Sequence, residues 1–333
     1  MNLLHPHTGL YTDLYELTMA QGHFFAGRHE TRAVFDYFFR KNPFEGGFVV
    51  FAGLADLLEA LQDFRYSAED IDYLAAQGFK PEFLDWLRHF RFRGDVWAAR
   101  EGEVVFPYAP IVRVEGTIVE TQLVETLLLN LLNFESLIAT KAARMRLVAG
   151  DRIIAEFGLR RAQGYGGMQA TRAAIVGGAN NTSNVLAGLH YGLPVTGTMA
   201  HAWIQSYEDE LTAFRKFAEQ YPERCILLVD TYDTLRSGIP NAITVARELE
   251  QRGYRLFGIR LDSGDLAWLS KRARQMLDEA GLTYVKILAS NQIDEYVIRS
   301  LREQQAPIDG YGVGTRLVTG HSSPALDGVY KLS

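Results

Sequence analysis

The chain has 333 residues, of which 47% are hydrophobic and 22% are charged. This ordinary globular composition excludes a disordered or fibrous protein, and the length is enough for about two domains. The net charge of −6 and the pI of about 5.8 exclude a nucleic-acid partner held by bulk positive charge. An anionic substrate therefore needs locally placed arginines.

The only cysteine, Cys225, lies inside an apolar run. One cysteine cannot form a disulfide within its own chain, and a buried thiol in a strand is the expected state. The first residues lack the basic segment and apolar run of a signal peptide. The leucine-rich stretch 121–137 is interrupted by polar residues, as in a buried helix rather than a membrane span. We expect a cytoplasmic protein with no membrane partner.

Residues 1–120 mix helices and strands without regular alternation, which predicts an α+β domain. A helix is expected to start with Thr12 or Asp13 as its cap. Two aromatic-rich strands, 33–40 and 47–51, are expected across a turn. The other expected elements are helices at 54–61, 68–76 and 82–90 and short strands at 95–99 and 111–115.

A helical segment over 121–150, broken once, leads into a regular pattern of strands and helices over 151–333. Helices are expected between the strands, for example at 237–251 and 265–280. Alternation of this kind predicts a parallel sheet, and six strand–helix units indicate a closed or nearly closed α/β barrel. The six expected strands are 152–157, 195–198, 225–229, 255–261, 285–288 and 310–313.

Polar residues follow each of these strands, at the edge where barrel enzymes carry their catalytic groups. The strand at 195–198 leads to His201, a residue type that often carries catalytic roles, although most histidines have no such role. The pair Arg160–Arg161 beside a glycine-rich loop is either a pyrophosphate clamp or a solvated charge pair. Asp262 and Asp265 are candidates for Mg²⁺ or ribose hydroxyls, and Asp265 alone is also a candidate helix cap.

The last two strands end in motifs that have both a structural and a functional interpretation. Ser290 and Asn291 are either site residues or caps of a helix over 293–301. The stretch 312–315, Gly-Val-Gly-Thr, offers backbone N–H groups and a hydroxyl to a phosphate monoester, although turns use the same residues. Polar groups at six successive strand ends, rather than any single motif, predict an active site.

Seven motifs occur in order along the chain: Thr12-Asp13-Leu14-Tyr15; Glu156-Phe157-Gly158-x-Arg160-Arg161-Ala162-Gln163-Gly164; Gly177-Gly178 with Thr182-Ser183-Asn184; Gly197-Thr198-Met199-Ala200-His201; Leu228-Val229-Asp230-Thr231-Tyr232-Asp233-Thr234; Arg260-Leu261-Asp262-Ser263-Gly264-Asp265-Leu266; and Gly312-x-Gly314-Thr315. Together they closely resemble the nicotinate phosphoribosyltransferase family over nearly the whole chain.

The resemblance implies an irregular TIM-like α/β barrel of the type II phosphoribosyltransferase kind over 151–333, joined through 121–150 to a sandwich-like α+β domain over 1–120. It implies transfer of the phosphoribosyl group of phosphoribosyl pyrophosphate to nicotinate, giving nicotinate mononucleotide for NAD biosynthesis. ATP hydrolysis is coupled through a phosphohistidine, which places the enzyme in the ligase class, and Mg²⁺ is the implied cofactor. A homodimer with shared active sites is also implied.

The resemblance assigns roles to residues by position. His201 is the phosphorylated histidine, and Tyr15, Thr198 and Arg260 contact nicotinate. The planar guanidinium of Arg260 suits the nicotinate carboxylate, and Tyr15 can stack on the pyridine ring. The sugar-phosphate site receives Thr315, Gly314, Gly312, Arg160, Asp262 and Ser290, while the metal ligands remain unassigned.

Three alternatives stay open. Nicotinamide phosphoribosyltransferase differs in how it meets the ring substituent, and the motif at 12–15 favours the nicotinate enzyme. Quinolinate phosphoribosyltransferase shares the presumed architecture without a phosphohistidine. A catalytically inactive phosphosugar-binding barrel is the non-enzymatic alternative. The sequence ends at Ser333, where relatives are expected to continue, so a truncated or minimal version is also expected.

Overall fold

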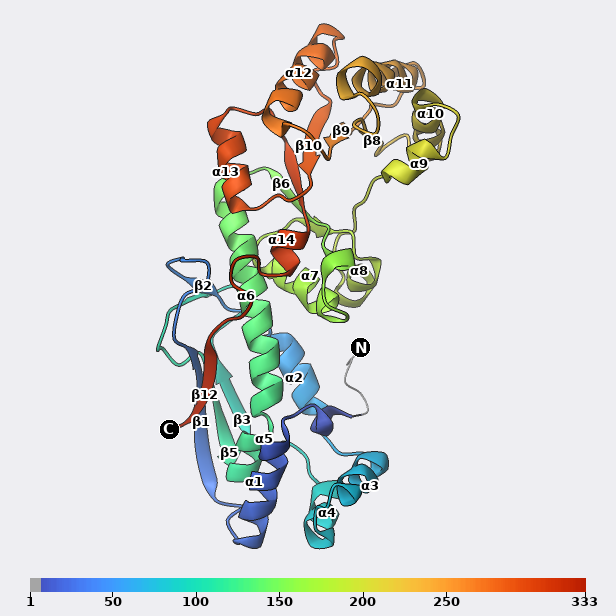
Figure 1. The fold of residues 1–333 in the computed structure, drawn as a ribbon. Helices are drawn as coiled ribbons and strands as arrows, with labels where there is room; N and C mark the ends of the chain where they lie inside the picture. The colour runs from blue at the N-terminus through green and yellow to red at the C-terminus, as the bar shows by residue number, and fades with distance from the viewer. Residues whose placement is uncertain (1–6) are drawn as a thin grey trace. The chain divides into compact units, whose positions relative to one another are not determined.

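The computed structural model describes residues 7–333, which form two compact units (Figure 1). The first unit contains the residues up to 141 together with 322–333, and the second contains 142–321. The sequence-based division instead assigned 151–333 to the barrel as a whole. The two divisions differ because the last strand, β12 (Gly328–Leu332), pairs antiparallel with β1 (Arg32–Phe39) of the first unit.

The first unit combines one antiparallel sheet, a two-stranded ladder and several helices. Four strands form the sheet in the order β12-β1-β5-β3, and β2 pairs with β4. Its remaining elements are η1 (Thr8–Leu10), α1 (Leu14–Phe25), β2 (Val49–Val50), α2 (Leu54–Gln62), α3 (Ala68–Ala76), α4 (Pro81–Arg88), β3 (Asp95–Ala98), β4 (Val104–Val105), β5 (Val112–Thr117), α5 (Ile118–Leu123) and α6 (Glu125–Ala149), the last of which continues into the second unit.

The strands expected across the turn near residue 44 both exist but do not pair with each other. Phe44 and Glu45 have left-handed backbone angles, with φ of 59° and 50°, and the chain leaves the main sheet there. It then enters the separate β2-β4 ladder. The expected strands were therefore correct in position, whereas their implied pairing was wrong.

The helical connection is broken once, as predicted, between α5 and α6 at Val124. Thr117 begins α5 with a capping box, because its hydroxyl accepts from the Glu120 backbone N–H and the Glu120 carboxylate accepts from the Thr117 N–H. The core of the first unit is rich in aromatic side chains, and Tyr37 and Phe83 are fully buried. Among residues 7–333, no helix is both long and apolar enough to cross a bilayer.

The second unit is a parallel sheet with helices on its outer side (Figure 1). Its elements are β6 (Ile153–Glu156), η2 (Leu159–Arg161), α7 (Gly166–Val176), β7 (Asn181–Thr182), α8 (Val185–Tyr191), α9 (His201–Gln205), α10 (Glu210–Gln220), β8 (Ile226–Leu228), the π-helix η3 (Thr234–Gly238), α11 (Ile239–Gln251), β9 (Gly258–Leu261), α12 (Leu266–Glu279), β10 (Lys286–Ser290), α13 (Glu295–Glu303), β11 (Gly310–Val313) and α14 (Thr315–Val318).

The sheet order β7-β6-β11-β10-β9-β8 follows the chain around an irregular barrel, which confirms the expected fold class. The strand expected at 195–198 is wrong, because only Val195 forms a bridge, to Thr182. The two-residue strand β7 takes its place in the sheet and was not predicted. Side-chain contacts, rather than a ladder, connect the 198–201 segment with the strand ends at 231 and 260.

Strand register divides the barrel residues into an inner and an outer face. Gly312 of β11 pairs with Ser290 of β10 on one side and with Ala155 of β6 on the other. The side chains of Ser290 and Ala155 therefore share the inner face. Ile154, Ile259 and Ile287 alternate with the inner residues and are fully buried on the outer face. The apolar outer face fixes the strands beneath the helices, so that inner side chains and strand ends remain for a site.

Candidate active site

His201 begins α9 and lies between a hydroxyl and a carboxylate. Its Nδ1 is 3.0 Å from Thr231 Oγ1, and its Nε2 is 3.6 Å from Asp262 Oδ2. The His201 side chain is 39% exposed, so the imidazole is oriented by neighbours yet open to a ligand. This is the environment that a nucleophilic or proton-transferring histidine requires.

Arg260 projects from β9 and is held by the segment that precedes His201. Its Nη1 donates to Thr198 Oγ1 at 2.7 Å, and its Nη2 donates to the Met199 carbonyl at 3.3 Å. Its Nε is buried without a partner among the described residues. Burial lowers the pKa of the Arg260 guanidinium, and the charges of Asp262 and Asp230 partly offset that effect.

Two aspartates organise the strand ends next to His201. Asp230 Oδ2 accepts from the Asp262 backbone N–H and from Ser263 Oγ, both at 2.7 Å. Asp262 in turn accepts a hydrogen bond from Ser290 Oγ. The other oxygen of Asp230, Oδ1, is buried and has no partner in the described part of the chain. Negative charge is therefore concentrated beside the imidazole.

Of the polar residues that the sequence offers as helix caps, Asp265 is one, whereas Ser290 and Asn291 are not. Asp265 is a helix cap, because its Oδ1 accepts from the Trp268 backbone N–H at 3.0 Å. The cap of α13 is Asp294, which accepts from two backbone N–H groups, so the capping interpretation of Ser290 and Asn291 is wrong. Ser290 is free of that structural task and faces Asp262 instead.

The loop after β6 is anchored by Glu156, which is fully buried. Its carboxylate accepts from Thr182 Oγ1 at 2.6 Å, from Thr171 Oγ1 at 3.0 Å and from the Gly158 backbone N–H. Arg160 follows on the exposed turn η2. Burial is the main cause that lowers the pKa of Arg260, and the positive charge of Arg160 acts in the same direction. Glu156 is thus a structural anchor, while Arg160 brings a cation to the site.

At the end of β11 the backbone lies close to Phe157, the residue that follows β6. A Cβ on Gly312 would lie 2.7 Å from the ring of Phe157, and a Cβ on Gly314 would lie 3.1 Å from the Phe157 carbonyl oxygen. Thr315 is the first residue of the short helix α14. Both glycines are therefore needed for close packing here, and they leave the Thr315 hydroxyl and nearby N–H groups at the strand end.

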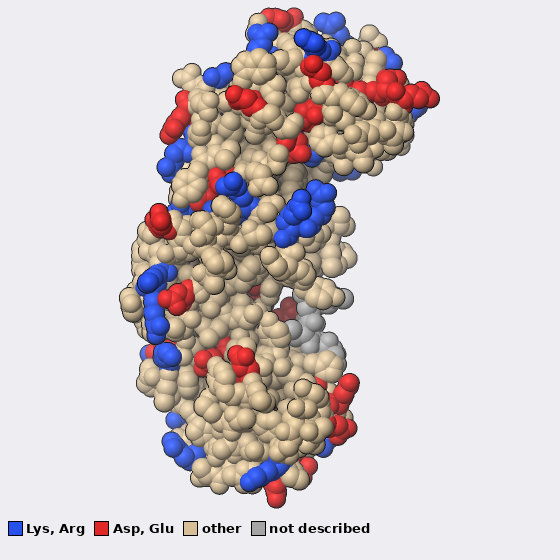
Figure 2. All heavy atoms as spheres, in the orientation of Figure 1, with Lys and Arg blue, Asp and Glu red and all other residues tan. Residues whose placement is uncertain are grey.

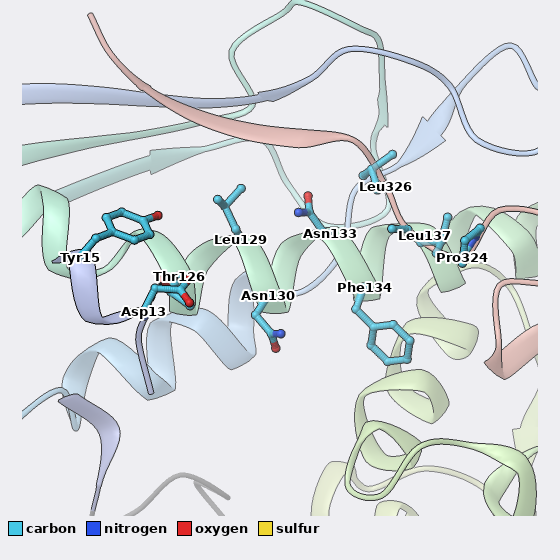
Figure 3. Close-up of a pocket in the computed structure, with 11 residues that line it drawn as sticks. Asp13, Tyr15, Thr126, Leu129, Asn130, Asn133, Phe134, Leu137, Pro324 and Leu326 are labelled. Atoms are coloured by element: carbon cyan, nitrogen blue, oxygen red, sulfur yellow. Dashed lines mark hydrogen bonds between the residues drawn. The ribbon is translucent and has the colours of Figure 1, made fainter. Parts of the chain in front are cut away.

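Tyr15 lies in the first unit, on α1, and is 48% exposed. It lines a cavity of about 350 Å³ formed by α1, α6 and the segment before β12. Figure 3 shows Tyr15 near one end of the row of α6 side chains that includes Asn133 and Phe134. Burial, and after it the charges of Glu16 and Glu125, raise the pKa of the Tyr15 hydroxyl, so this phenol stays protonated near neutral pH.

The visible surface carries both signs of charge. Figure 2 shows acidic and basic side chains interspersed over the face that it draws. No set of three or more histidine, cysteine, aspartate or glutamate side chains within residues 7–333 is arranged to hold a metal ion.

The structure brings most of the predicted site residues together at one edge of the barrel. Direct contacts join His201 to Asp262 and Asp262 to Ser290. Arg260 contacts Thr198, which precedes His201 in the same segment, so the five residues form one cluster. Tyr15 belongs to the other unit. Sequence reasoning listed Asp230 and Thr231 at a strand end without giving them a role, and Asn181 was missed because its strand has only two residues.

Comparison with known proteins identifies relatives over nearly the whole chain. Residues 10–133 match the family model of the nicotinate phosphoribosyltransferase (NAPRTase) N-terminal domain. The nicotinate phosphoribosyltransferase of Bacillus subtilis is 52% identical over 97% of this chain and 66% of its own length. One from Mycobacterium tuberculosis is 48% identical over 99% of this chain and 71% of its own length.

A solved structure agrees with these relatives. The crystal structure of human nicotinic acid phosphoribosyltransferase matches with a TM-score of 0.87 and 36% identity, covering 96% of this chain and 74% of the human chain. The chain thus spans about two thirds of the length of the curated relatives it matches. On this similarity in both sequence and fold, the chain belongs to the nicotinate phosphoribosyltransferase family.

Proposed function

We propose that the chain transfers the phosphoribosyl group of phosphoribosyl pyrophosphate to nicotinate, forming nicotinate mononucleotide and pyrophosphate. The observation that carries this proposal is the connected cluster of His201, Asp262 and Ser290 beside Arg260 and Thr198. We assign to this barrel edge a carboxylate receptor, a nucleophilic imidazole and sugar-binding polar groups, and the contacts within the cluster support that assignment. Membership of the family supports the same reaction.

Nicotinate binding is assigned to Arg260 and Thr198. The Nε–H of Arg260, which has no partner among residues 7–333, can donate to the carboxylate, while Thr198 and the Met199 carbonyl fix the guanidinium plane. A charge-assisted bond of this kind is stronger than a neutral one. Tyr15, which is protonated and half exposed, supplies an aromatic face to the pyridine ring, from its own subunit or from a neighbour.

Phosphoribosyl pyrophosphate is assigned to the ends of β6, β9, β10 and β11. Gly312 and Gly314 allow close backbone approach, and the Thr315 hydroxyl donates to the sugar phosphate. Arg160 neutralises the pyrophosphate, and Asp262 and Ser290 face the ribose. As pyrophosphate leaves, positive charge develops at the anomeric carbon, so these residues act by positioning and by neutralising the leaving group.

The donor set fits Mg²⁺ carried by substrate phosphates. Mg²⁺ usually takes one or two carboxylates and completes its shell with water and phosphate oxygens. Suitable carboxylate oxygens in this part of the barrel are those of Asp262 and Oδ1 of Asp230, which has no partner in the described part of the chain. Bound Mg²⁺ would neutralise charge on the leaving pyrophosphate.

ATP coupling is assigned to His201. A neutral imidazole nitrogen attacks the terminal phosphorus of ATP, so that an N–P bond forms and the P–O bond to ADP breaks. Hydrolysis of the phosphohistidine then releases phosphate. We expect His201→Ala to lose ATP stimulation while keeping slow ATP-independent transfer, and retained stimulation in this variant would refute the role.

The decisive measurement is product formation from nicotinate or nicotinamide with phosphoribosyl pyrophosphate and Mg²⁺, with and without ATP. We expect turnover of nicotinate but not of nicotinamide, and we expect ATP to stimulate it. Preferential turnover of nicotinamide would support the nicotinamide enzyme instead. Folded protein that binds phosphoribosyl pyrophosphate without any turnover would support the inactive phosphosugar-binding barrel.

A homodimer with shared active sites is part of the proposal, since Tyr15 belongs to a different unit from His201. Mixing Tyr15→Ala chains with His201→Ala chains tests it. Recovery of ATP-coupled activity in confirmed mixed dimers is expected, and no recovery would assign Tyr15 to its own subunit's site. The cytoplasmic location stays a prediction, which fractionation of the source cells would test.

A further inference from the structure

The interior of the second unit contains a cavity of about 100 Å³. Barrel interiors of this class are usually filled by layers of bulky branched side chains. Here strand register places four small inner residues side by side in the row nearer the carboxyl ends: Ser290, Gly312, Ala155 and Asn181. The cavity exists because these side chains are too short to fill the space.

Three residues of the cavity lining carry a buried polar atom that has no hydrogen-bond partner among the described residues: Arg260 at Nε, Asn181 at Oδ1 and Tyr311 at its hydroxyl. Tyr311 pairs with Ile154, so its side chain alternates to the outer face. The donor Nε of Arg260 and the acceptor Oδ1 of Asn181 are the two on the inner face. Buried polar groups in folded proteins nearly always have hydrogen-bond partners, because burying such a group without a hydrogen bond costs free energy. A buried acceptor facing an open cavity therefore points to a ligand group that donates to it.

The adjacent Asn180 provides an internal contrast. Its Oδ1 accepts from the Ile154 backbone N–H at 2.8 Å and from Arg146 Nη2 at 2.5 Å. Asn180 therefore has a structural task outside the cavity. Asn181, with the same side chain one position later, faces inward and has no comparable task.

Arg260 and Asn181 belong to separate walls of this cavity. Their strands, β9 and β7, are separated in the sheet by β10, β11 and β6. If the nicotinate carboxylate lies on Arg260 and the reacting ring nitrogen faces the mouth, ring carbon 5 points away from the carboxylate. A group on that carbon is then directed toward the wall that carries Asn181.

We propose, resting on the proposed function, that this cavity is a subsite for a small hydrogen-bonding substituent at position 5 of a pyridine-3-carboxylate. Asn181 is its specificity-determining residue. A 5-hydroxyl donates to Asn181 Oδ1, whereas a 5-methyl group of similar size leaves that oxygen without a partner. The cavity volume of about 100 Å³ limits the substituent to a small group.

The test compares kcat/KM for 5-hydroxynicotinate and 5-methylnicotinate in the intact chain and in Asn181→Leu. One neutral hydrogen bond predicts a preference for the hydroxyl of roughly three- to tenfold in the unchanged chain. The preference should disappear in Asn181→Leu and in the smaller variant Asn181→Ala. Asn180→Ala is the matched control, which should lower thermal stability while leaving the preference unchanged.

Equal preference ratios in the unchanged chain and the Asn181 variants would overturn the proposal. Turnover of nicotinate without turnover or binding of either 5-substituted acid would also overturn it. If nicotinate itself is not turned over, the proposed function fails separately, and calorimetric binding of the same two acids then tests the subsite. Equal binding of both acids by the unchanged chain would be the negative result in that case.

Discussion

His201 Nδ1 and Thr231 Oγ1 lie 3.0 Å apart, which joins the start of α9 to the end of β8 where no strand ladder does so. This contact occupies Nδ1 of the imidazole, while the other nitrogen, Nε2, lies near Asp262. A hydroxyl can donate or accept, so it can hold either tautomer of the ring without taking its proton. Thr231 is therefore a positioning residue for His201.

Replacing Thr231 with valine tests this positioning role, because valine keeps the shape and removes the hydroxyl. We expect ATP-stimulated turnover to fall roughly three- to tenfold, the effect of one hydrogen bond, with little change in the KM for nicotinate. Thr231→Ser should retain most of the stimulation. Thr244→Val is the control, since that hydroxyl bonds only within its helix. Equal activity of the valine and serine variants would contradict the role.

Arg260→Lys should raise the KM for nicotinate by one to two orders of magnitude. A lysine ammonium keeps the charge but cannot hold Thr198, the Met199 carbonyl and a carboxylate in one plane. The KM for phosphoribosyl pyrophosphate should change much less. A similar rise in both constants would show that the substitution disturbs the strand ends in general, and would count against a specific carboxylate contact.

Local sequence signals predicted elements whose stability depends on nearby residues. The capped helix after Asp265 and the strand at 310–313 were both found this way, because cap and burial patterns are local. The prediction failed where distant residues decide the structure. The 195–198 segment has strand-forming residues but forms one bridge, while the pairing of β12 with β1 joins residues almost 300 positions apart.

The same distinction applies to the site. The family resemblance assigned His201 and Arg260, and their motifs are contiguous in sequence. The Ser290–Asp262 hydrogen bond and the Asn181 cavity depend on strand register, which no motif encodes. The wrong capping role for Ser290 had a local cause, because Asp294 offers a better cap four residues closer to the helix.

Glu16 should make the protein less stable as pH rises from about 4.5 to about 7. Burial raises the pKa of this carboxyl to about 7 in the folded chain, while its ordinary value is 4.5. The folded state thus holds a proton that the unfolded state loses, so stability falls across this window and then levels off. Above pH 7, Glu16→Gln should raise the free energy of unfolding by up to about 3 kcal/mol, because glutamine has no proton to lose.

Thermal unfolding between pH 4 and 8 measures the effect of Glu16→Gln. The variant keeps an acceptor for the Gln122 side chain, which donates to Glu16 at 3.0 Å. Its gain in melting temperature should be absent near pH 4 and largest above pH 7. Exposed Glu303→Gln serves as the control and should follow the unchanged chain throughout. A gain that does not depend on pH would refute the ionisation argument.

Arg316 should support both stability and phosphate binding, because it ties α14 to the start of α13. Its Nη1 lies 2.5 Å from Asp294 Oδ2, and the Asp294 side chain is only 2% exposed. Arg316→Met leaves that carboxylate buried without its cation, and we expect a loss of about 1–3 kcal/mol in the free energy of unfolding. Because Thr315 precedes Arg316, the KM for phosphoribosyl pyrophosphate should rise more than the KM for nicotinate.

Arg215→Met is the matched control for this substitution. Arg215 also pairs with a carboxylate, that of Glu248, but the two side chains are 44% and 37% exposed, and such surface pairs contribute about 1 kcal/mol or less. Urea unfolding of both variants gives the stability difference, and steady-state kinetics gives the two KM values. Equal destabilisation by the two substitutions would refute the buried-pair argument. Unchanged KM for phosphoribosyl pyrophosphate in Arg316→Met would separate the ion pair from the Thr315 phosphate site, since the hydroxyl would then keep its place without the tie to α13.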